Sequence, residues 1–302
     1  MNKALLCLLS SLFLGTLVTN AKVLIITPVY NRPDFIQIQV RTFKKFFQDE
    51  YTFLVFNDAS NPQMQRKIEQ TCQTLGIECI RVPQTLHDVD PLCHQAPTSF
   101  RHGESLHFAL TNYGFKHDDF VMIIDSDVFL IHNFSVKRFM QDHDLYVVFG
   151  GSLLPQLCFL NMPNLPRPQD IDFRAGYVNN NAIFWDVGCR TRGYIEAHPQ
   201  LRLKHAEPHW GGLDLLNLDL TQNLASQLQA KQFLPAEISL INDIIKLGAK
   251  DGYHYDADIG FFEGNTFLDY KHGSGWHGAK DEVTKKKNRL INAFIKALLR
   301  TP

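Results

Sequence analysis

The sequence predicts an α/β fold with a mostly parallel sheet, helices on both faces and a mixed second half. In the first half of the chain, short apolar runs alternate with segments whose apolar residues recur at helical spacing. The runs are continuously apolar, which is typical of strands buried on both faces of a sheet. With 302 residues, 45% of them hydrophobic, the chain can form one large domain or two small ones.

The first half is expected to contain strands at 23–26, 51–58, 77–82 and 120–124, and helices at 35–47, 63–75 and 105–113. Pro91, Pro97 and Gly103 mark residues 84–103 as irregular. In the second half we expect strands at 144–152, 175–188 and 267–278, an irregular Pro-rich stretch at 155–172, and helices at 215–231, 235–247 and 282–299. We divide the chain after residue 21 into a first half, 22–135, and a second half, 136–302, of one domain.

The N-terminal segment has the pattern of a secretory signal peptide. Lys3 precedes an uncharged, Leu-rich run from 4 to 18, and small or short residues follow at 19–21. The run is short for a membrane span. If this signal peptide is cleaved during export, the protein is expected to be secreted or to lie in the lumen of the secretory pathway. A signal anchor that holds the protein on a membrane and an N-terminal helix packed on the domain are the alternatives.

Charge and cysteine content exclude some classes of protein. The net charge of −1 gives no reason to expect a nucleic-acid partner. Without Cys7 of the signal segment, five scattered cysteines remain, which is not a disulfide framework, and no C-x-x-C pair suggests a zinc site. A local bridge between Cys72 and Cys79 is an option in an oxidising compartment.

Two carboxylates interrupt the most apolar region of the chain. Asp125 and Asp127, separated by Ser126, follow the run 120–124 and precede another apolar run at 128–131. An unpaired buried carboxylate is costly, so this pair needs a countercharge. Carboxylates are hard ligands that suit Mg²⁺ or Mn²⁺, and such an ion keeps positions open for a diphosphate. Solvated loop acids or helix caps are the alternative interpretation.

Polar residues also follow the first two predicted strands. The loop "TPVYNRP" contains Pro28, Tyr30 and Asn31, and Asp58 ends the second strand. Ligands bind beyond the carboxyl ends of parallel strands, so these residues are expected to meet the carboxylate pair and Ser126 there, with Ser126 also contacting the ligand. Tyr30 offers a flat face to a base, and Asp58 can accept a hydrogen bond from a uracil-type N–H or a ribose hydroxyl. Ordinary turn chemistry is the alternative.

The segments "VLIITPVYNRPDFI", "FLVFNDAS" and "FVMIIDSDVFLI", in this order, resemble the nucleotide-binding half of GT-A fold glycosyltransferases, especially family 2. The resemblance extends over about residues 22–135, and it implies that this half binds the nucleotide sugar and that 136–302 is the acceptor-binding half of the same catalytic domain. It implies a GT-A type fold, binding of the base by Asp58, and binding of a metal ion and the donor diphosphate by Asp125 and Asp127. The family's Arg-Asn pair before the D-x-D motif is absent from "GESLHFALTNYG". Arg101 is our candidate for the missing positive charge.

Three further site residues are expected in the second half. A late histidine often completes the metal site in this fold, and His272 in "YKHGSGWHG" fits that pattern better than His277. Asp214, after "HWGG", resembles the acceptor-side acidic motif and is the candidate base of an inverting reaction. A helix cap is its alternative role, and Glu207 is a weaker candidate base. Asn180, in the run 179–181, is expected to contact the donor sugar, unless the run is merely a turn.

The sequence therefore predicts a metal-dependent glycosyltransferase, hexosyltransferase-like, that uses Mn²⁺ or Mg²⁺. It would move a sugar from a nucleotide-diphosphate donor, with a UDP-sugar favoured, to a glycan, lipid or protein hydroxyl. The alternatives are a catalytically degenerate glycan- or nucleotide-binding module and a metal-dependent phosphohydrolase. A nucleotidyltransferase is disfavoured because "TPVYNRPDF" lacks glycine. The basic, amphipathic segment 282–299 is expected to pack on the domain, with peripheral membrane contact as the alternative.

Overall fold

The computed structural model describes residues 22–88, 97–147, 151–178, 183–206, 211–212, 223–251, 259–270 and 282–300. Its centre is a seven-stranded sheet in the order β10-β6-β7-β4-β1-β2-β3. β7 runs antiparallel to both of its neighbours, and the other strands of this sheet are parallel to one another. The bounds of these strands are β1 (Val23–Val29), β2 (Tyr51–Asn57), β3 (Glu78–Arg81), β4 (Phe120–Ile124), β6 (Leu145–Val147), β7 (Leu157–Asn161) and β10 (Leu203–His205).

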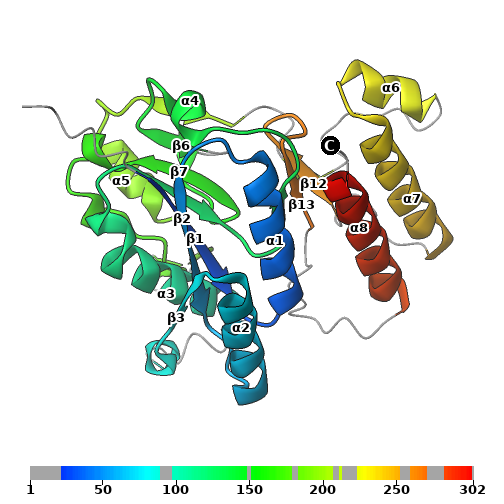
Figure 1. Ribbon diagram of the computed structural model, residues 1–302. Helices are drawn as coiled ribbons and strands as arrows, with labels where there is room; N and C mark the ends of the chain where they lie inside the picture. The colour runs from blue at the N-terminus through cyan, green and yellow to red at the C-terminus, as the bar shows by residue number, and fades with distance from the viewer. Residues whose placement is uncertain are drawn as a thin grey trace, which may run out of the picture.

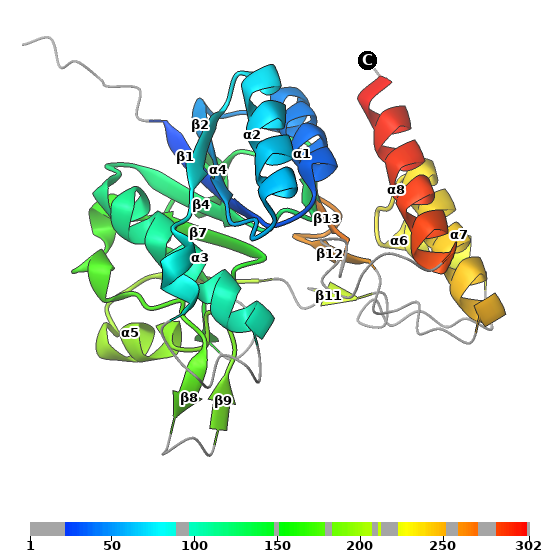
Figure 2. The ribbon, with the colours of Figure 1, turned by 90° about the horizontal axis from the view of Figure 1, so that it is seen from below.

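Helices cover both faces of this sheet (Figures 1 and 2). On one face, α1, α2 and α4 pack on strand residues such as Ile25, Val55 and Ile124. On the other face, α3 and α5 pack on the alternate strand residues, such as Ile26, Phe56 and Ile123. The bounds of the helices are α1 (Pro33–Phe46), α2 (Pro62–Leu75), α3 (Pro97–Asn112), α4 (Val136–Met140) and α5 (Thr191–Ala197). The predicted mostly parallel α/β fold is confirmed.

A second sheet begins immediately after the carboxylate pair. Its order is β11-β12-β13-β5, and all of its pairings are antiparallel. Besides the two cores on the faces of the large sheet, which we call the first and second core, this sheet forms a third core with the last helices and with Phe35 of α1. Residues 125–127 therefore connect the two sheets. The elements are β5 (Val128–Leu130), β11 (Gly211–Gly212), β12 (Gly260–Phe262), β13 (Phe267–Asp269), α6 (Leu224–Ala230), α7 (Pro235–Asp251) and α8 (Glu282–Arg300).

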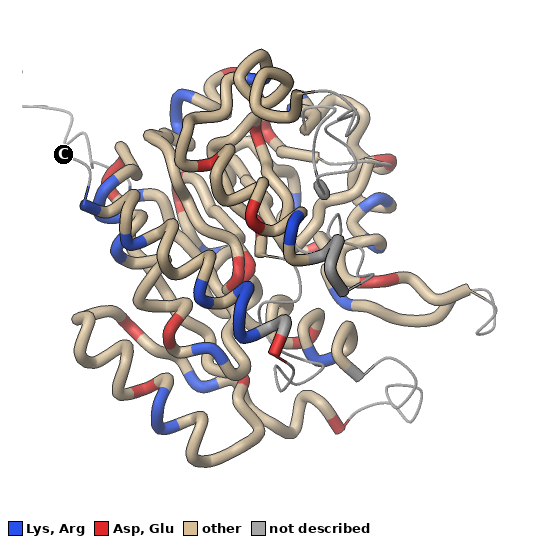
Figure 3. The backbone as a smooth tube through the Cα atoms, turned by 90° about the vertical axis from the view of Figure 1, so that its right-hand side faces the viewer, with Lys and Arg blue, Asp and Glu red and all other residues tan. Residues whose placement is uncertain are grey.

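The last helix packs on the domain, as predicted. Ile291, Phe294 and Ile295 of α8 are buried in the third core. The basic residues of α8 are mostly exposed, and Figure 3 marks the positions of Lys and Arg along the backbone in blue. Among the residues that the structure describes, no helix is long and apolar enough to cross a membrane. The predicted signal segment, 1–21, lies outside the described residues.

Several predicted boundaries were wrong. β1 continues to Val29, so Pro28 lies in the strand and not in the loop. α3 starts at Pro97, inside the stretch expected to be irregular, because proline is well tolerated in the first turn of a helix. β7 lies inside the Pro-rich stretch, and the strand predicted at 175–188 is instead the hairpin of β8 (Gly176–Val178) and β9 (Ile183–Trp185). The helix predicted at 215–231 is described only from 224.

Candidate active site at the carboxyl ends of the strands

The carboxyl ends of β1, β2 and β4 converge on one pocket of about 90 Å³. This is the edge of a parallel sheet at which ligands bind in doubly wound folds. β1 lies between β2 and β4, so polar residues that are far apart in the sequence become neighbours. The residues that line the pocket are Pro28, Val29, Tyr30, Asp58, His102, Ser105, Asp125, Ser126 and Asp127. Six of them were predicted as site residues from the sequence.

The turn that contains the two carboxylates is held by backbone hydrogen bonds. The fully buried amide of Gln39, on α1, donates to the carbonyl oxygens of Asp125 (2.7 Å) and Val128 (3.0 Å). The backbone N–H of Tyr270 donates to the carbonyl oxygen of Asp127 at 2.9 Å. Two separate segments, α1 and the residue after β13, therefore fix this connection between the sheets. Such support keeps the positions of the carboxylates constant, which a binding site requires.

His102 lies beside the carboxylate pair. Its Nε2 lies 3.1 Å from Oδ1 of Asp125. Burial of the imidazole favours its neutral form, but the negative charges of Asp125, Asp127 and Asp58 outweigh this effect, so the pKa of His102 is raised. In its protonated form, His102 would supply part of the countercharge that the two carboxylates need.

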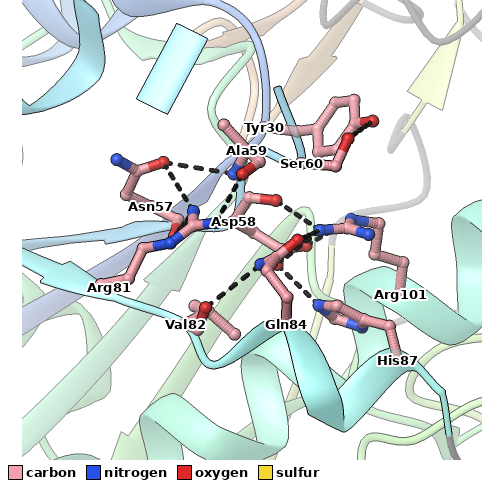
Figure 4. Close-up of polar contacts among 10 residues, drawn as sticks. All are labelled: Tyr30, Asn57, Asp58, Ala59, Ser60, Arg81, Val82, Gln84, His87 and Arg101. Atoms are coloured by element: carbon pink, nitrogen blue, oxygen red, sulfur yellow. Dashed lines mark hydrogen bonds and ion pairs between the residues drawn. The ribbon is translucent and has the colours of Figure 1, made fainter. Parts of the chain in front are cut away.

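Asp58 lies at the centre of a dense polar network (Figure 4). Its carboxylate forms an ion pair with Nε of Arg101 at 2.9 Å, and its Oδ1 also accepts hydrogen bonds from Arg101 and from Gln84 at 3.2 Å. Nε2 of His87 lies 2.7 Å from the same oxygen. The side chain of Asp58 is only 5% exposed. The network fixes one rotamer of Asp58 at the pocket wall.

Arg101 connects this network to the predicted base-binding residues. Its guanidinium carbon lies 5.0 Å from the centre of the Tyr30 ring, within the range of a cation–π contact. The Tyr30 hydroxyl shares a hydrogen bond of 2.7 Å with Ser60. Arg101 therefore contacts Asp58 and Tyr30, and its predicted role at a donor diphosphate stays a prediction. Tyr30 also lines a neighbouring pocket of about 190 Å³ together with Asn31 and Lys67.

The carboxylate pair fits a hard divalent cation in its chemistry. Both side chains offer oxygen ligands at one pocket, and two carboxylates leave positions for other oxygens. In the described part of the chain, no group of three or more His, Cys, Asp or Glu side chains is arranged to hold a metal ion. The predicted ligand His272 lies outside the described residues, as do the predicted site residues Asn180 and Asp214.

Sequence reasoning missed several residues of this site. His102 and Ser105 lie three positions apart on α3, with Arg101 beside them, but 84–103 was expected to be irregular. The Ser105 side chain is 1% exposed, and its hydroxyl has no hydrogen-bond partner among the described residues. Gln84 and His87, which contact Asp58, lie in a short 3₁₀ helix of the same stretch. The polar pair His102 and Ser105, spaced i and i+3 on one face of the helix, was the signal available in the sequence.

Comparison with known proteins gives likenesses to solved structures only. No protein-family model matches the sequence, and no curated protein matches it. The chain is similar to S. aureus TarS over 50% of its own length and 30% of that chain, with 17% identity and a TM-score of 0.35. It is similar to S. aureus TarS 1-349 in complex with UDP over 50% of both chains, with 18% identity and a TM-score of 0.34.

A third similar structure is glucosyl-3-phosphoglycerate synthase from Mycobacterium tuberculosis in complex with phosphoglyceric acid. The similarity covers 62% of this chain and 70% of that one, with 13% identity and a TM-score of 0.39. The chain spans half or less of the TarS structures. Likenesses this distant establish no activity. The fold class is assigned from the seven-stranded sheet itself, which has the mostly parallel arrangement that the sequence predicted.

Proposed function

We propose that this protein is a glycosyltransferase that moves a sugar from a nucleotide-diphosphate donor to a hydroxyl acceptor. The observation that carries the proposal is the convergence of Tyr30, Asp58, Asp125 and Asp127 on one pocket at the carboxyl ends of the parallel strands. A UDP-sugar is the favoured donor. A glycan, a lipid or a protein hydroxyl is the proposed class of acceptor.

The chemistry of the pocket divides into two parts. Tyr30 and Asp58 offer a ring face and a hydrogen-bond acceptor, which suit a base and a ribose, and Arg101 holds both in place. Asp125 and Asp127 follow β4. A metal ion bound by these carboxylates would supply the positive charge that a diphosphate needs. The pocket of about 90 Å³ has room for an ion and diphosphate oxygens, whereas a whole ligand usually needs ~300 Å³ or more. The neighbouring pocket beside Asn31 and Tyr30 offers additional room.

Asp125 and Asp127 would hold Mn²⁺ or Mg²⁺. Bound there, the ion would offset the negative charge that develops on the departing nucleotide diphosphate. His102 lies at the same edge, with its Nε2 3.1 Å from Asp125. Gln39 keeps the turn between the carboxylates in position.

Residues of the second half complete the proposal. Asp214 is the candidate base if the reaction inverts the anomeric carbon, and Asn180 is the candidate contact to the donor sugar. An inverting transferase needs a carboxylate that removes the acceptor proton near neutral pH. We assign the protein to the secretory lumen or the exterior, with membrane anchoring by 1–21 as the alternative.

The direct test of the proposal is an activity assay with a panel of UDP- and GDP-sugars. Each donor is incubated with the full chain and Mn²⁺ or a chelator, and release of UDP or GDP is measured. We expect one UDP-sugar to be hydrolysed or transferred only when Mn²⁺ is present. An Asp125→Asn variant should lose this activity, whereas the exposed-site variant Asp170→Asn should keep it. Nucleotide binding without turnover of any donor would favour the binding module, and a lack of both would exclude the proposal.

A further inference from the structure

Cys72 and Cys79 lie on different elements but pack in the same hydrophobic cluster, where their thiols interact. Cys72 is on α2, fully buried in the first core, and Cys79 is on β3 and partly exposed. α2 ends at Gly76, whose φ of +66° lets the chain reverse, and the N–H of Ile77 donates to the carbonyl oxygen of Cys72 at 3.1 Å. This turn carries the chain directly from the helix into the strand. Both cysteines are free thiols.

The contact gives the two thiols unequal chemistry. The S–H of Cys72 donates a hydrogen bond to the sulfur of Cys79. This bond, reinforced by burial, raises the pKa of Cys72. The same hydrogen bond lowers the pKa of Cys79, with help from the Asn57 side chain and Arg81, against the effects of burial and Glu69. The partly exposed sulfur of Cys79 is therefore the better nucleophile, and the buried sulfur of Cys72 lies beside it.

Other cysteines in the described part of the chain lack this combination. Cys158 is fully buried, and burial raises its pKa. Cys189 is partly exposed like Cys79, but burial and the charge of Asp186 raise its pKa. Cys189 is therefore a suitable reference for Cys79, because both side chains are partly exposed but the pKa of the Cys189 thiol is raised, which makes it less reactive. Neither residue of the Cys72–Cys79 pair lines the strand-end pocket.

We propose that Cys72 and Cys79 are a peroxide-reactive thiol pair that closes to an intramolecular disulfide. The Cys79 thiolate attacks one oxygen of a hydroperoxide, the O–O bond breaks, and an alcohol, or water from hydrogen peroxide, leaves after taking up a proton. Cys79 becomes a sulfenic acid. The Cys72 sulfur then attacks the Cys79 sulfur, the S–O bond breaks, and water leaves with the Cys72 proton. The two thiols are oxidised by two electrons, and the hydroperoxide is reduced by two.

This pair lies next to the candidate active site without being part of it. The Asn57 side chain that contacts Cys79 also accepts a hydrogen bond of 3.2 Å from the N–H of Ala59, and Asp58 lies between them. Cys79 itself pairs with Val55 across the β2–β3 ladder. The disulfide would join α2 to the edge strand of the sheet at this point.

Peptide mapping of the full chain tests the proposal. Reduced protein is treated with hydrogen peroxide, unfolded, alkylated and digested with trypsin. Cys72 and Cys79 fall in one tryptic peptide, 68–81, and additional cleavage after Glu78 separates them. We expect this peptide to lose two hydrogen atoms, to resist alkylation, and to remain joined after cleavage at Glu78 until a reductant is added. Full alkylation of both cysteines after peroxide treatment would overturn the proposal.

Trapping experiments assign the roles of the two sulfurs. In Cys72→Ala, a dimedone-type reagent should label Cys79 as a sulfenic acid, and in Cys79→Ala it should not label Cys72. In the untreated wild-type protein, iodoacetamide should modify Cys79 faster than Cys189. The last measurement needs no variant, so it decides the matter even if a substitution prevents folding. Equal or slower modification of Cys79 would contradict the assigned nucleophile.

Discussion

The buried side-chain amide of Gln39 donates a hydrogen bond of 2.7 Å to the backbone carbonyl oxygen of Asp125. A second bond from the same amide, 3.0 Å long, goes to Val128, so α1 spans the turn that carries both carboxylates. The Gln39 side-chain oxygen in turn accepts from the Thr27 hydroxyl at 3.3 Å, which adds β1 to the network. The geometry of the candidate metal site thus depends on a neutral residue outside the pocket.

Replacing Gln39 with Leu should loosen this turn. The substitution removes the donor from two carbonyl oxygens, and we expect a loss of about 2 kcal/mol in the free energy of unfolding. Affinity for UDP in the presence of Mn²⁺ should fall as well. Gln37→Leu is the matched control, because Gln37 is an exposed residue of the same helix. Denaturant unfolding and calorimetric titration measure the two effects, and equal behaviour of both variants would refute the role of Gln39.

Removing Arg101 should leave the Asp58 carboxylate buried without its main partner. The side chains of Arg101 and Asp58 are 16% and 5% exposed, so we expect Arg101→Ala to cost about 3 kcal/mol of stability. Arg101→Lys should recover only part of this loss, because lysine cannot reproduce the contacts of both guanidinium nitrogens. Arg192→Ala, which breaks an exposed pair with Glu196, should cost about 0.5 kcal/mol or less. Denaturant unfolding of the three variants checks the order.

A pH-dependent contribution to stability is expected from Asp144. Burial tends to raise the pKa of this carboxyl, but hydrogen bonds from Arg202 and Asn164 outweigh burial and lower it. A pKa lowered by folding means that the carboxylate stabilises the protein fully above its unfolded value, about 3.9. That contribution is lost as the pH falls through the folded value.

The stability difference between wild type and Asp144→Asn should therefore be constant near neutral pH and shrink below about pH 4. Urea unfolding at several pH values measures it. Asp170→Asn is the control, because the ion pair of Asp170 with Arg167 is exposed and should contribute little at any pH. A difference for Asp144→Asn that stays constant down to about pH 3 would show that the lowered pKa does not act in folding.

Two glycines near α5 should respond oppositely to the same substitution. Gly188 has a φ of +84°, and a Cβ there would lie 2.1 Å from the carbonyl oxygen of Leu153. Gly188→Ala should therefore lower the melting temperature strongly or prevent folding. Gly193 lies inside α5, where an added Cβ would meet no atom of the described residues within 4 Å. Gly193→Ala should be neutral or stabilise by about 0.5–1 kcal/mol. Thermal unfolding of both variants checks this contrast.

The residues at the strand ends could be predicted because the sequence marks them clearly. Buried strands give continuous apolar runs, and the polar residues that end such runs in a parallel sheet meet at one edge. This rule identifies Asp58, Asp125 and Asp127 from the sequence alone. His102 and Ser105 on α3 could not be found in this way, because their place depends on contacts between distant segments.

Gly103 shows why the prediction for α3 failed. We interpreted it as a loop residue, but it lies in α3 where a Cβ would come within 2.8 Å of the Ala175 backbone nitrogen. Glycine is needed there for close packing rather than for a turn. β7 was missed for a similar reason: its five residues are buried by pairing with β4, and the flanking prolines suggested a loop. Long-range packing overrode the local signal in both places.

The central claim is that the strand-end pocket binds a nucleotide diphosphate with a divalent ion held at Asp125 and Asp127. Calorimetric titration of UDP into the full chain, with Mn²⁺ or with a chelator, tests it most directly when wild type is compared with Asp127→Asn. We predict binding that requires Mn²⁺ and weakens tenfold or more in the variant, or about 1.4 kcal/mol. Binding of UDP that is equally tight with the chelator, or unchanged in Asp127→Asn, would contradict the account.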